Sequence, residues 1–210
     1  MRELVRNFSK DLLQSVILPG SFLWRLPSAA GLALTFDDGP DPEFTPPLLD
    51  LLREHGVAAS FFLIGSKVRR HPRLAARIVA EGHTVGGHGY DHEVITSMSH
   101  ARLGEDLERC RATIREATGV DTRLFRPPKG KVNVGSIRSV HVHGYRMVHW
   151  SRTYGDYRRD GVEALLQRMK RDLPRSGEIV LLHDNNSFTI DVLAQSLPEW
   201  KSMPLAFAKL

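Results

Sequence analysis

Short apolar segments alternate with longer amphipathic segments along most of the chain. The short segments predict strands, and the longer ones, with apolar residues at helical spacing, predict helices. The predicted strands span residues 32–36, 58–64, 83–85, 124–126, 146–150 and 178–183. The predicted helices span residues 45–55, 72–81, 100–118, 134–143, 162–172 and 190–200. This alternation is typical of an α/β protein with a parallel sheet, and about seven strand–helix units predict an incomplete, distorted (β/α) barrel.

The first part of the chain shows a different pattern. Apolar residues recur at helical spacing over residues 2–17 while charged residues occupy the other face, which predicts an amphipathic helix. Pro19 and Pro27 then interrupt regular structure before the first strand. We therefore expect two parts: an N-terminal helix with its connector over residues 1–27, and a single folded domain over residues 28–210.

The predicted N-terminal helix has two interpretations. It can cap the core of the domain, or it can lie on a membrane surface with Arg2, Arg6 and Lys10 directed toward lipid head groups. Glu3 and Asp11 interrupt the apolar stretch that a secretory signal requires. The sequence therefore predicts a cytoplasmic protein, with peripheral attachment of this helix to the inner face of the membrane as the alternative.

Composition and charge narrow the range of functions. With 210 residues and 41% apolar content, the chain can bury a full core as one domain. The formal net charge of +5 comes largely from arginines spread over many segments, without the interleaved aromatic residues of a nucleic-acid groove. We therefore predict no nucleic-acid partner. The single cysteine, Cys110, cannot form an internal disulfide, and its apolar helical position predicts burial.

Two adjacent carboxylates, Asp37 and Asp38, follow directly after the first predicted strand. Like charges in contact favour a cation nearby, because neither carboxylate is easily removed from water alone. His88 and His92 are four positions apart, so we expect them to share one face of a helical turn and to bind one metal ion. One carboxylate with two imidazoles leaves room for water, which predicts a hydrolytic centre in which the other carboxylate is the base.

Further polar residues also occur at or just after the ends of predicted strands. In parallel α/β folds the carboxyl ends of the strands are where functional sites are built. We therefore expect these residues to converge on one face of the barrel: Asp37, Asp38, His88, Arg126, Trp150, His183 and Asp184.

Five ordered motifs in the chain resemble those of polysaccharide deacetylases. They are Thr35-Phe36-Asp37-Asp38-Gly39-Pro40, His88-x-x-x-His92, Arg126-Pro127-Pro128, Trp150-Ser151 leading to Asp156-Tyr157, and Leu181-Leu182-His183-Asp184. In order and approximate spacing they resemble the NodB-homology group, carbohydrate esterase family 4, over nearly all of residues 32–200. A single Asp-Asp-Gly is weak evidence, whereas all five motifs together are highly specific.

The resemblance implies a role for each motif in amide hydrolysis. Asp38, His88 and His92 are the implied metal ligands, and the metal would activate water and polarise the acyl carbonyl. Asp37 is the implied general base, and Arg126 would pair with it and keep it ionised.

The same resemblance implies groups that act on the substrate. His183 is the candidate general acid, with Asp156 raising its pKa so that it is protonated near neutrality. The backbone N–H of Lys129 would stabilise the oxyanion. Trp150 and Leu181 resemble the residues that enclose the acetyl methyl group. The implied substrate-binding residues are Pro128, Lys129, Trp150, Tyr157 and Leu181.

The implied activity is that of a metal-dependent hydrolase that removes an N-acetyl or other N-acyl group from an amino sugar in a polysaccharide, an oligosaccharide or a glycan precursor. Nitrogen and carboxylate donors with open positions suit Zn²⁺, with Co²⁺ and Ni²⁺ as alternatives. Two other functions stay open at this point. One is deformylation of a lipid-linked amino sugar or deacylation of a non-glycan amide, and the other is a metal-free carbohydrate-binding relic.

Four positions depart from the family pattern. Gly89 stands where Ser or Thr usually follows the first histidine, and Glu93 stands where Pro usually follows the second. Lys129 replaces an aromatic residue, and Tyr157 replaces Trp, both at positions that border the substrate groove in the family. Because an ammonium group suits a phosphate or carboxylate better than a neutral sugar ring, Lys129 predicts a negatively charged substrate.

Overall fold

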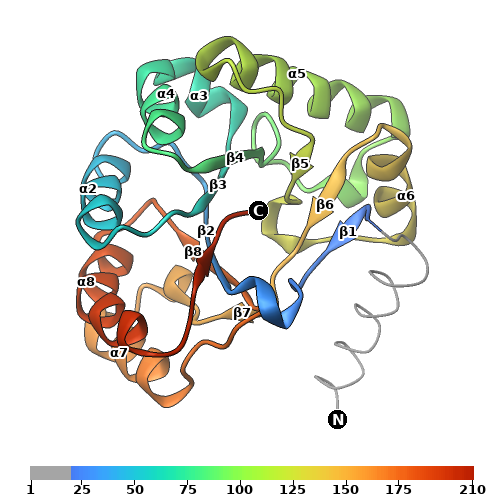
Figure 1. Cartoon of the computed structure of the whole chain (residues 1–210). Coiled ribbons are helices and arrows are strands. Elements are labelled where there is room, and N and C mark those ends of the chain that lie inside the picture. Colours follow the sequence, from blue (N-terminus) through green and yellow to red (C-terminus); the bar gives the residue numbers. More distant parts are fainter. Residues whose placement is uncertain (1–19) are drawn as a thin grey trace.

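The structure, a computed structural model, describes residues 20–210 of the chain. Its central feature is a sheet of parallel strands in the order β1-β6-β5-β4-β3-β2-β8-β7, with β9 paired to β2 (Figure 1). The strands are β1 (Phe22–Leu23), β2 (Leu32–Asp37), β3 (Ser60–Leu63), β4 (Thr84–Gly87), β5 (Leu124–Phe125), β6 (Arg146–Val148), β7 (Arg152–Thr153), β8 (Ile179–His183) and β9 (Phe207–Ala208). Because β1 and β7 end the order and do not pair, the barrel is incomplete, which confirms the predicted α/β architecture.

The helices surround the outside of the sheet (Figure 1). The α-helices are α2 (Thr45–His55), α3 (Gly65–Arg70), α4 (Pro72–Ala80), α5 (His100–Thr118), α6 (Val134–Val142), α7 (Val162–Arg171) and α8 (Ser187–Ser202). Short 3₁₀ turns, all in the connections, are η2 (Ser28–Ala30), η3 (Ile95–Ser97), η4 (Pro128–Gly130) and η5 (Asp156–Arg158).

Strand β2 shows how alternate residues of a strand pack on the two faces of the sheet. Every residue of Leu32–Asp37 is buried, as expected for a central parallel strand covered on both faces. Side chains alternate between faces, so Leu34 and Phe36 join the core under the helices while Ala33 joins the cluster inside the barrel. By the same alternation Asp37 points into the barrel. The register pairs Asp37 with His183 on β8, which brings these two groups to the same level.

The sequence pattern did not predict three of the four two-residue strands within residues 20–210. Strands β1, β7 and β9 have two residues each, and their pairing partners are distant in sequence. Phe22–Leu23, which we assigned to the connector, forms part of the barrel sheet because it pairs in parallel with β6. Helix α3, a single short helix between β3 and α4, was also not expected. The predicted amphipathic helix over residues 2–17 lies outside the described residues, so its membrane contact and the cytoplasmic location stay predictions.

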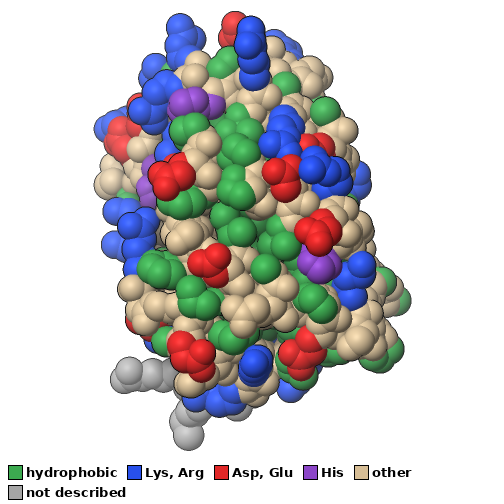
Figure 2. Space-filling view, turned by 90° about the vertical axis from the view of Figure 1, so that its left-hand side faces the viewer, with side chains coloured by type: hydrophobic (Ala, Val, Ile, Leu, Met, Phe, Trp, Pro, Cys, Tyr) green, Lys and Arg blue, Asp and Glu red, His purple; other side chains and the backbone are tan. Residues whose placement is uncertain are grey.

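The outer surface of the helices is a mixture of charged and apolar side chains (Figure 2). On the side formed by α2 and α4, Arg77 bridges Asp50 and Glu81, with N to O distances of 2.6 Å to each. Exposed ion pairs of this kind contribute little to stability. Within residues 20–210, no helix is both long enough and apolar enough to cross a membrane.

Candidate active site

The carboxylate of Asp37 is fixed by a buried arginine. Arg126 comes directly after β5 and is fully buried, and its Nη1 donates to Asp37 Oδ1 at 2.7 Å. The same nitrogen donates to Thr35 Oγ1 at 2.7 Å, and Nη2 donates to the carbonyl of His149 at 3.2 Å. Burial lowers the pKa of Arg126, and the charge of Asp37 opposes that shift. Asp37 is therefore held by one oxygen, which leaves Oδ2 directed toward the site.

Asp38 reaches the same cavity as Asp37 because the strand ends between them. Successive strand residues point to opposite faces, but Asp38 has a left-handed φ of 78°, which changes the direction of the chain. Asn185 Nδ2 donates to Asp38 Oδ2 at 2.9 Å. The other oxygen, Oδ1, is buried and has no hydrogen-bond partner among the described residues. A non-glycine residue in this conformation costs on the order of 1 kcal/mol, and that strain here places a carboxylate oxygen ready for a ligand.

The two histidines approach Asp38 from a loop after β4. His88 Nδ1 lies 2.8 Å from the carbonyl of Arg126, which directs its Nε2 toward Asp38 Oδ1 at 3.6 Å. His92 Nε2 lies 3.3 Å from the same oxygen. The expected helical turn is wrong, because residues 88–94 are not helical and both Gly89 and His92 have positive φ. The loop is held instead by tertiary contacts.

Those contacts join the histidine loop to its neighbours. The N–H of Tyr90 donates to the Asp106 carboxylate on α5 at 3.1 Å. The carbonyls of Gly89 and Tyr90 accept from Gly65 and Ser66 at the start of α3, at 3.0 and 2.8 Å. The side-chain convergence that we expected from helical spacing is therefore produced by packing of the loop against α3 and α5.

The three side chains fit a divalent metal ion. One ligand atom from each of Asp38, His88 and His92 can be chosen so that all three lie within 4.8 Å of one another. Burial lowers the pKa of His92, and the neighbouring His88 lowers it further, so the imidazole is neutral and can act as a ligand. The unpartnered Asp38 Oδ1 is the additional sign that a cation belongs here.

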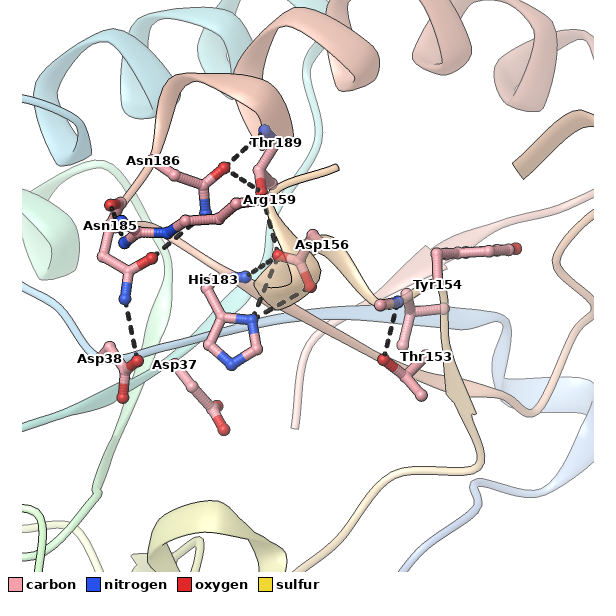
Figure 3. A network of polar contacts seen from close by, with 12 residues as sticks. Asp37, Asp38, Thr153, Tyr154, Asp156, Arg159, His183, Asn185, Asn186 and Thr189 are labelled. Atoms are coloured by element: carbon pink, nitrogen blue, oxygen red, sulfur yellow. Dashed lines mark hydrogen bonds and ion pairs between the residues drawn. The ribbon is translucent and has the colours of Figure 1, made fainter. Parts of the chain in front are cut away.

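His183 lies at the end of β8 and faces the two aspartates (Figure 3). Its Nδ1 is 3.1 Å from Asp156 Oδ1, and its backbone N–H donates to Asp156 Oδ2 at 2.7 Å. Thr189 Oγ1 donates to the same carboxylate at 2.9 Å. Burial alone would lower the pKa of His183, but the hydrogen bond and charge of Asp156, helped by Asp37 and Asp38, raise it to about 9. The imidazole is thus protonated at neutral pH with Nε2 toward the site.

These groups surround one cavity of about 420 Å³. Most of the predicted residues line it, whereas Arg126 and Asp156 support its wall from behind. Pro128, predicted to bind substrate, is buried and is not part of the lining. Tyr157 is 57% exposed and meets His183 edge-on with ring centroids 6.0 Å apart. The lining residues are Asp37, Asp38, His88, His92, Lys129, Gly130, Trp150, Tyr157, Leu181 and His183.

Comparison with known proteins agrees with this arrangement. A model of the polysaccharide deacetylase family matches residues 27–148, more than half of the chain. The chain belongs to the polysaccharide deacetylase family. Members of this family generally depend on a divalent metal ion, as the Asp38, His88 and His92 cluster would require.

Individual polysaccharide deacetylases are similar over most of their length. A peptidoglycan-N-acetylglucosamine deacetylase of Bacillus cereus is 36% identical over 203 residues, covering 93% of this chain and 94% of that protein. A chitooligosaccharide deacetylase of Sinorhizobium fredii is 36% identical over 157 residues, covering 74% of this chain and 73% of that protein. The crystal structure of a peptidoglycan N-acetylglucosamine deacetylase with 4-naphthalen-1-yl-N-oxidanyl-benzamide aligns with a TM-score of 0.87 and 26% identity, covering 95% of each chain.

Sequence reasoning missed Gly130, which lines the cavity of this polysaccharide deacetylase. Gly130 has a φ of 61°, and a Cβ atom there would lie 2.3 Å from Trp150 Cη2. Lys129, just before it, is also left-handed, with a φ of 58°. The backbone N–H of Lys129 has no acceptor among the described residues, whereas the N–H of Gly130 donates to Pro127. The turn therefore packs against Trp150 and leaves the N–H of Lys129 available for a substrate oxygen.

Asp184 has a structural role that the sequence did not predict. Its carboxyl group is fully buried and accepts from Thr45 Oγ1 at 2.6 Å, while Thr45 Oγ1 accepts from the N–H of Asp41 at 2.7 Å. A Cβ atom on Gly39 would lie 2.2 Å from Asp184 Oδ2. Burial raises the pKa of Asp184 to about 7. Asp184 thus supports the loop that carries Asp37 and Asp38, and only glycine fits above it.

Replacing Asp156 with asparagine is expected to move the alkaline limit of activity to lower pH. Below its pKa His183 can give a proton to the leaving amine, and above its pKa this function is lost. Asp156→Asn removes the negative charge that raises the pKa, so the loss begins at least about one pH unit earlier. The measurement is kcat/KM from about pH 6 to about pH 10.

Thr189→Val is the matched control for this profile, because Thr189 contacts the same carboxylate but leaves its charge in place. We expect the alkaline limit of this variant to stay near that of the unmodified protein. An alkaline limit that is the same in Asp156→Asn as in the unmodified protein would exclude His183 as the acid.

Proposed function

We propose that this protein is a metal-dependent deacetylase that removes the N-acetyl group from an N-acetylglucosamine residue of a bacterial cell-wall glycan. The observation that carries the proposal is the single cavity in which a metal-ligand set, a carboxylate base and a protonated histidine meet. Amide hydrolysis needs these functions together, because the amide is a poor electrophile and its amine is a poor leaving group.

Asp37 and His183 are suited to the two proton transfers. Asp37 Oδ2, which Arg126 does not bind, would accept a proton from the attacking water. His183 would donate the proton from Nε2 to the leaving nitrogen, because Nδ1 is engaged with Asp156. Proton transfers by placed side chains each contribute about 10²- to 10⁴-fold to the rate. The two groups lie on the paired strands β2 and β8, which sets their separation.

The remaining charge develops on the acyl oxygen. The N–H of Lys129 would donate to this oxygen, since no other group of the described chain accepts from it. A divalent ion bound by Asp38, His88 and His92 supplies Lewis-acid activation of water and carbonyl. Removing one oxyanion donor typically costs about 10²- to 10³-fold in rate.

Acetyl is the acyl group that the lining best accommodates. Leu181 is buried, and the indole of Trp150 stacks on His149 with ring centroids 4.2 Å apart. This apolar corner of the cavity lies beside the two catalytic groups. A methyl group fits such a corner, and we propose that Leu181 and Trp150 enclose it.

Zinc is the metal that we propose. Two imidazole nitrogens and one carboxylate oxygen, with positions left for water and substrate, form a ligand set typical of catalytic zinc. Co²⁺ and Ni²⁺ suit the same donors, so metal analysis of the purified protein has to decide among them.

The names of the relatives favour a glycan substrate. The Bacillus cereus and Sinorhizobium fredii proteins are named for peptidoglycan N-acetylglucosamine and for chitooligosaccharide. These substrates share N-acetylglucosamine, which supports placing this sugar in the cavity. The chain spans 94% of the Bacillus cereus protein, so both proteins have room for the same catalytic domain.

An acetate-release assay tests the proposed function. We expect release from peptidoglycan or chitooligosaccharides, loss of release after treatment with a chelator, and recovery on addition of Zn²⁺. Lipid-linked amino sugars form a third set of substrates, and formate release from them would favour the deformylase alternative. No acyl release from any substrate by the metal-loaded protein would contradict the proposal.

A further inference from the structure

Lys129 carries a positive charge at the catalytic cavity and forms no ion pair within residues 20–210. It lines the cavity and is exposed, and no carboxylate lies within ion-pair distance of its ammonium group among the described residues. By contrast, Arg102, close to the histidine loop, forms an ion pair with Glu93 at 2.6 Å. An exposed, unpaired lysine at a substrate cavity is available to a substrate anion.

The position of Lys129 is set by its backbone. The left-handed φ of 58° at Lys129 and the packing of Gly130 against Trp150 hold the turn above the site. The side chain of Lys129 lines the same cavity as the metal-ligand residues Asp38, His88 and His92. The side chain therefore stands beside the place where the reacting sugar must bind.

A second cation, Arg159, lies near the site on another loop, outside the cavity lining. Arg159 follows η5 and is exposed, and its Nη2 lies 3.5 Å from the carbonyl of Asn185, the residue whose amide contacts Asp38 (Figure 3). Nearby, Arg168 pairs with Asp160 at 2.7 Å. Arg159, by contrast, has no carboxylate partner in the part of the chain that the structure describes. Arg159 also has a left-handed φ of 53°, which turns the chain at this point.

We infer that Lys129 and Arg159 are specificity-determining residues that bind anionic groups of the substrate next to the sugar that loses its acetyl group. The inference rests on the proposed function and narrows its substrate to a glycan that carries carboxylate or phosphate groups, in preference to a neutral one. A lysine and an arginine from two different loops can bind groups on two parts of a chain, and both favour phosphate and carboxylate over hydroxyl. Their contribution should appear mainly in KM, because such binding is similar in the ground and transition states.

The test compares substrates that differ at one group, which is anionic or neutral. One is an oligosaccharide of N-acetylglucosamine with a carboxylate on the neighbouring sugar, the second is its methyl ester, and the third carries a phosphate in place of the carboxylate. We expect the unmodified protein to prefer the anionic forms, and the preference to decline as salt rises, because the Debye length shortens to about 8 Å at physiological ionic strength. The ratio between carboxylate and phosphate identifies which anion the site binds.

Two variants and two matched controls complete the test. Lys129→Gln and Arg159→Gln should each reduce the preference for the anionic substrate by up to about fivefold, the upper end of the range for an exposed ion pair. Lys131→Gln, two positions along the same loop but outside the cavity lining, and Arg171→Gln, at the last residue of α7, should leave the preference unchanged. Lys129→Tyr should in addition raise kcat/KM on the neutral ester, because an aromatic ring packs on a sugar face.

The outcomes separate this inference from the proposed function. Acetate release from both acid and ester at equal kcat/KM, unaffected by either variant, would overturn the inference while the deacetylase function stands. Release from none of the substrates would overturn the proposed function itself. A loss of preference in the Lys131→Gln control as large as that in Lys129→Gln would assign the effect to general surface charge and would also overturn the inference.

Discussion

Replacing His88 or His92 with alanine is expected to remove the bound metal and the deacetylase activity together. Both imidazoles face Asp38 Oδ1, at 3.6 and 3.3 Å. Within residues 20–210, these three residues form the one group of His, Cys, Asp or Glu side chains close enough together to hold a metal ion. Loss of an outer partner of a metal ligand already costs about 10- to 100-fold in affinity. Loss of a ligand should exceed that range, and metal per chain and acetate release measure the two effects.

His55→Ala is the control for the histidine variants. His55 ends α2 and is not part of the metal-ligand cluster, so its removal should leave both metal content and activity near normal. Because His88 is buried, its variant also needs a check of folding by circular dichroism and thermal unfolding. Retention of one metal ion per chain in folded His88→Ala and His92→Ala protein would exclude the proposed ligand set.

Asp37→Asn is expected to lower kcat by at least about 10²-fold while the metal stays bound. An amide has nearly the shape of the carboxylate but cannot accept the proton, and Asp38, His88 and His92 are unchanged. The variant also leaves the fully buried Arg126 without its counterion. Breaking a buried ion pair costs about 3 to 5 kcal/mol, so a lower melting temperature is expected as well.

The two effects of Asp37→Asn can be separated by measurement. Metal content and kcat are determined at a temperature well below the melting transition, where the variant is folded. Asp156→Asn serves as a comparison, because it also alters a buried carboxylate but should act through the pH profile of His183. Near-normal turnover of folded, metal-loaded Asp37→Asn protein would move the base to another group, with His183 the next candidate.

Two of the three longest helices of the described chain were predictable with their bounds because their signals are local. Helix α2 was predicted with its observed bounds, as it begins with Pro46 in its first turn and ends at left-handed Gly56. Helix α5 was also predicted with its observed bounds, and it begins after the N-cap Ser99 and ends at Gly119. Each signal lies within the helix or at its ends. Strands β1, β7 and β9 have no such signal, because their hydrogen bonds go to residues far away in the chain.

The sequence predicted which residue types form the site and that they lie at the ends of strands. Asp37 and His183 are the last residues of parallel strands, Asp38 and His88 come directly after such strands, and these strand ends meet at one edge of the sheet. The prediction of a helical turn between the two histidines was wrong, because sequence spacing alone cannot distinguish a helix from a loop that packs on other elements. Gly89, at a φ of 74°, belongs to such a loop. The loop is held by the Asp106 carboxylate on α5, which accepts from the N–H of Tyr90.

The sequence by itself determined the α/β class, the chemical groups available for hydrolysis and the end of the sheet where they gather, because these follow from alternation, helical spacing and motif order. Only the tertiary structure decided which oxygen of Asp37 faces the site, how Asp184 and Thr45 support the aspartate loop, and that Pro128 is buried behind the cavity. It also decided that Arg159 comes close to Asn185. Each of these depends on contacts between segments distant in sequence, which are set by packing of the whole domain and have no local pattern.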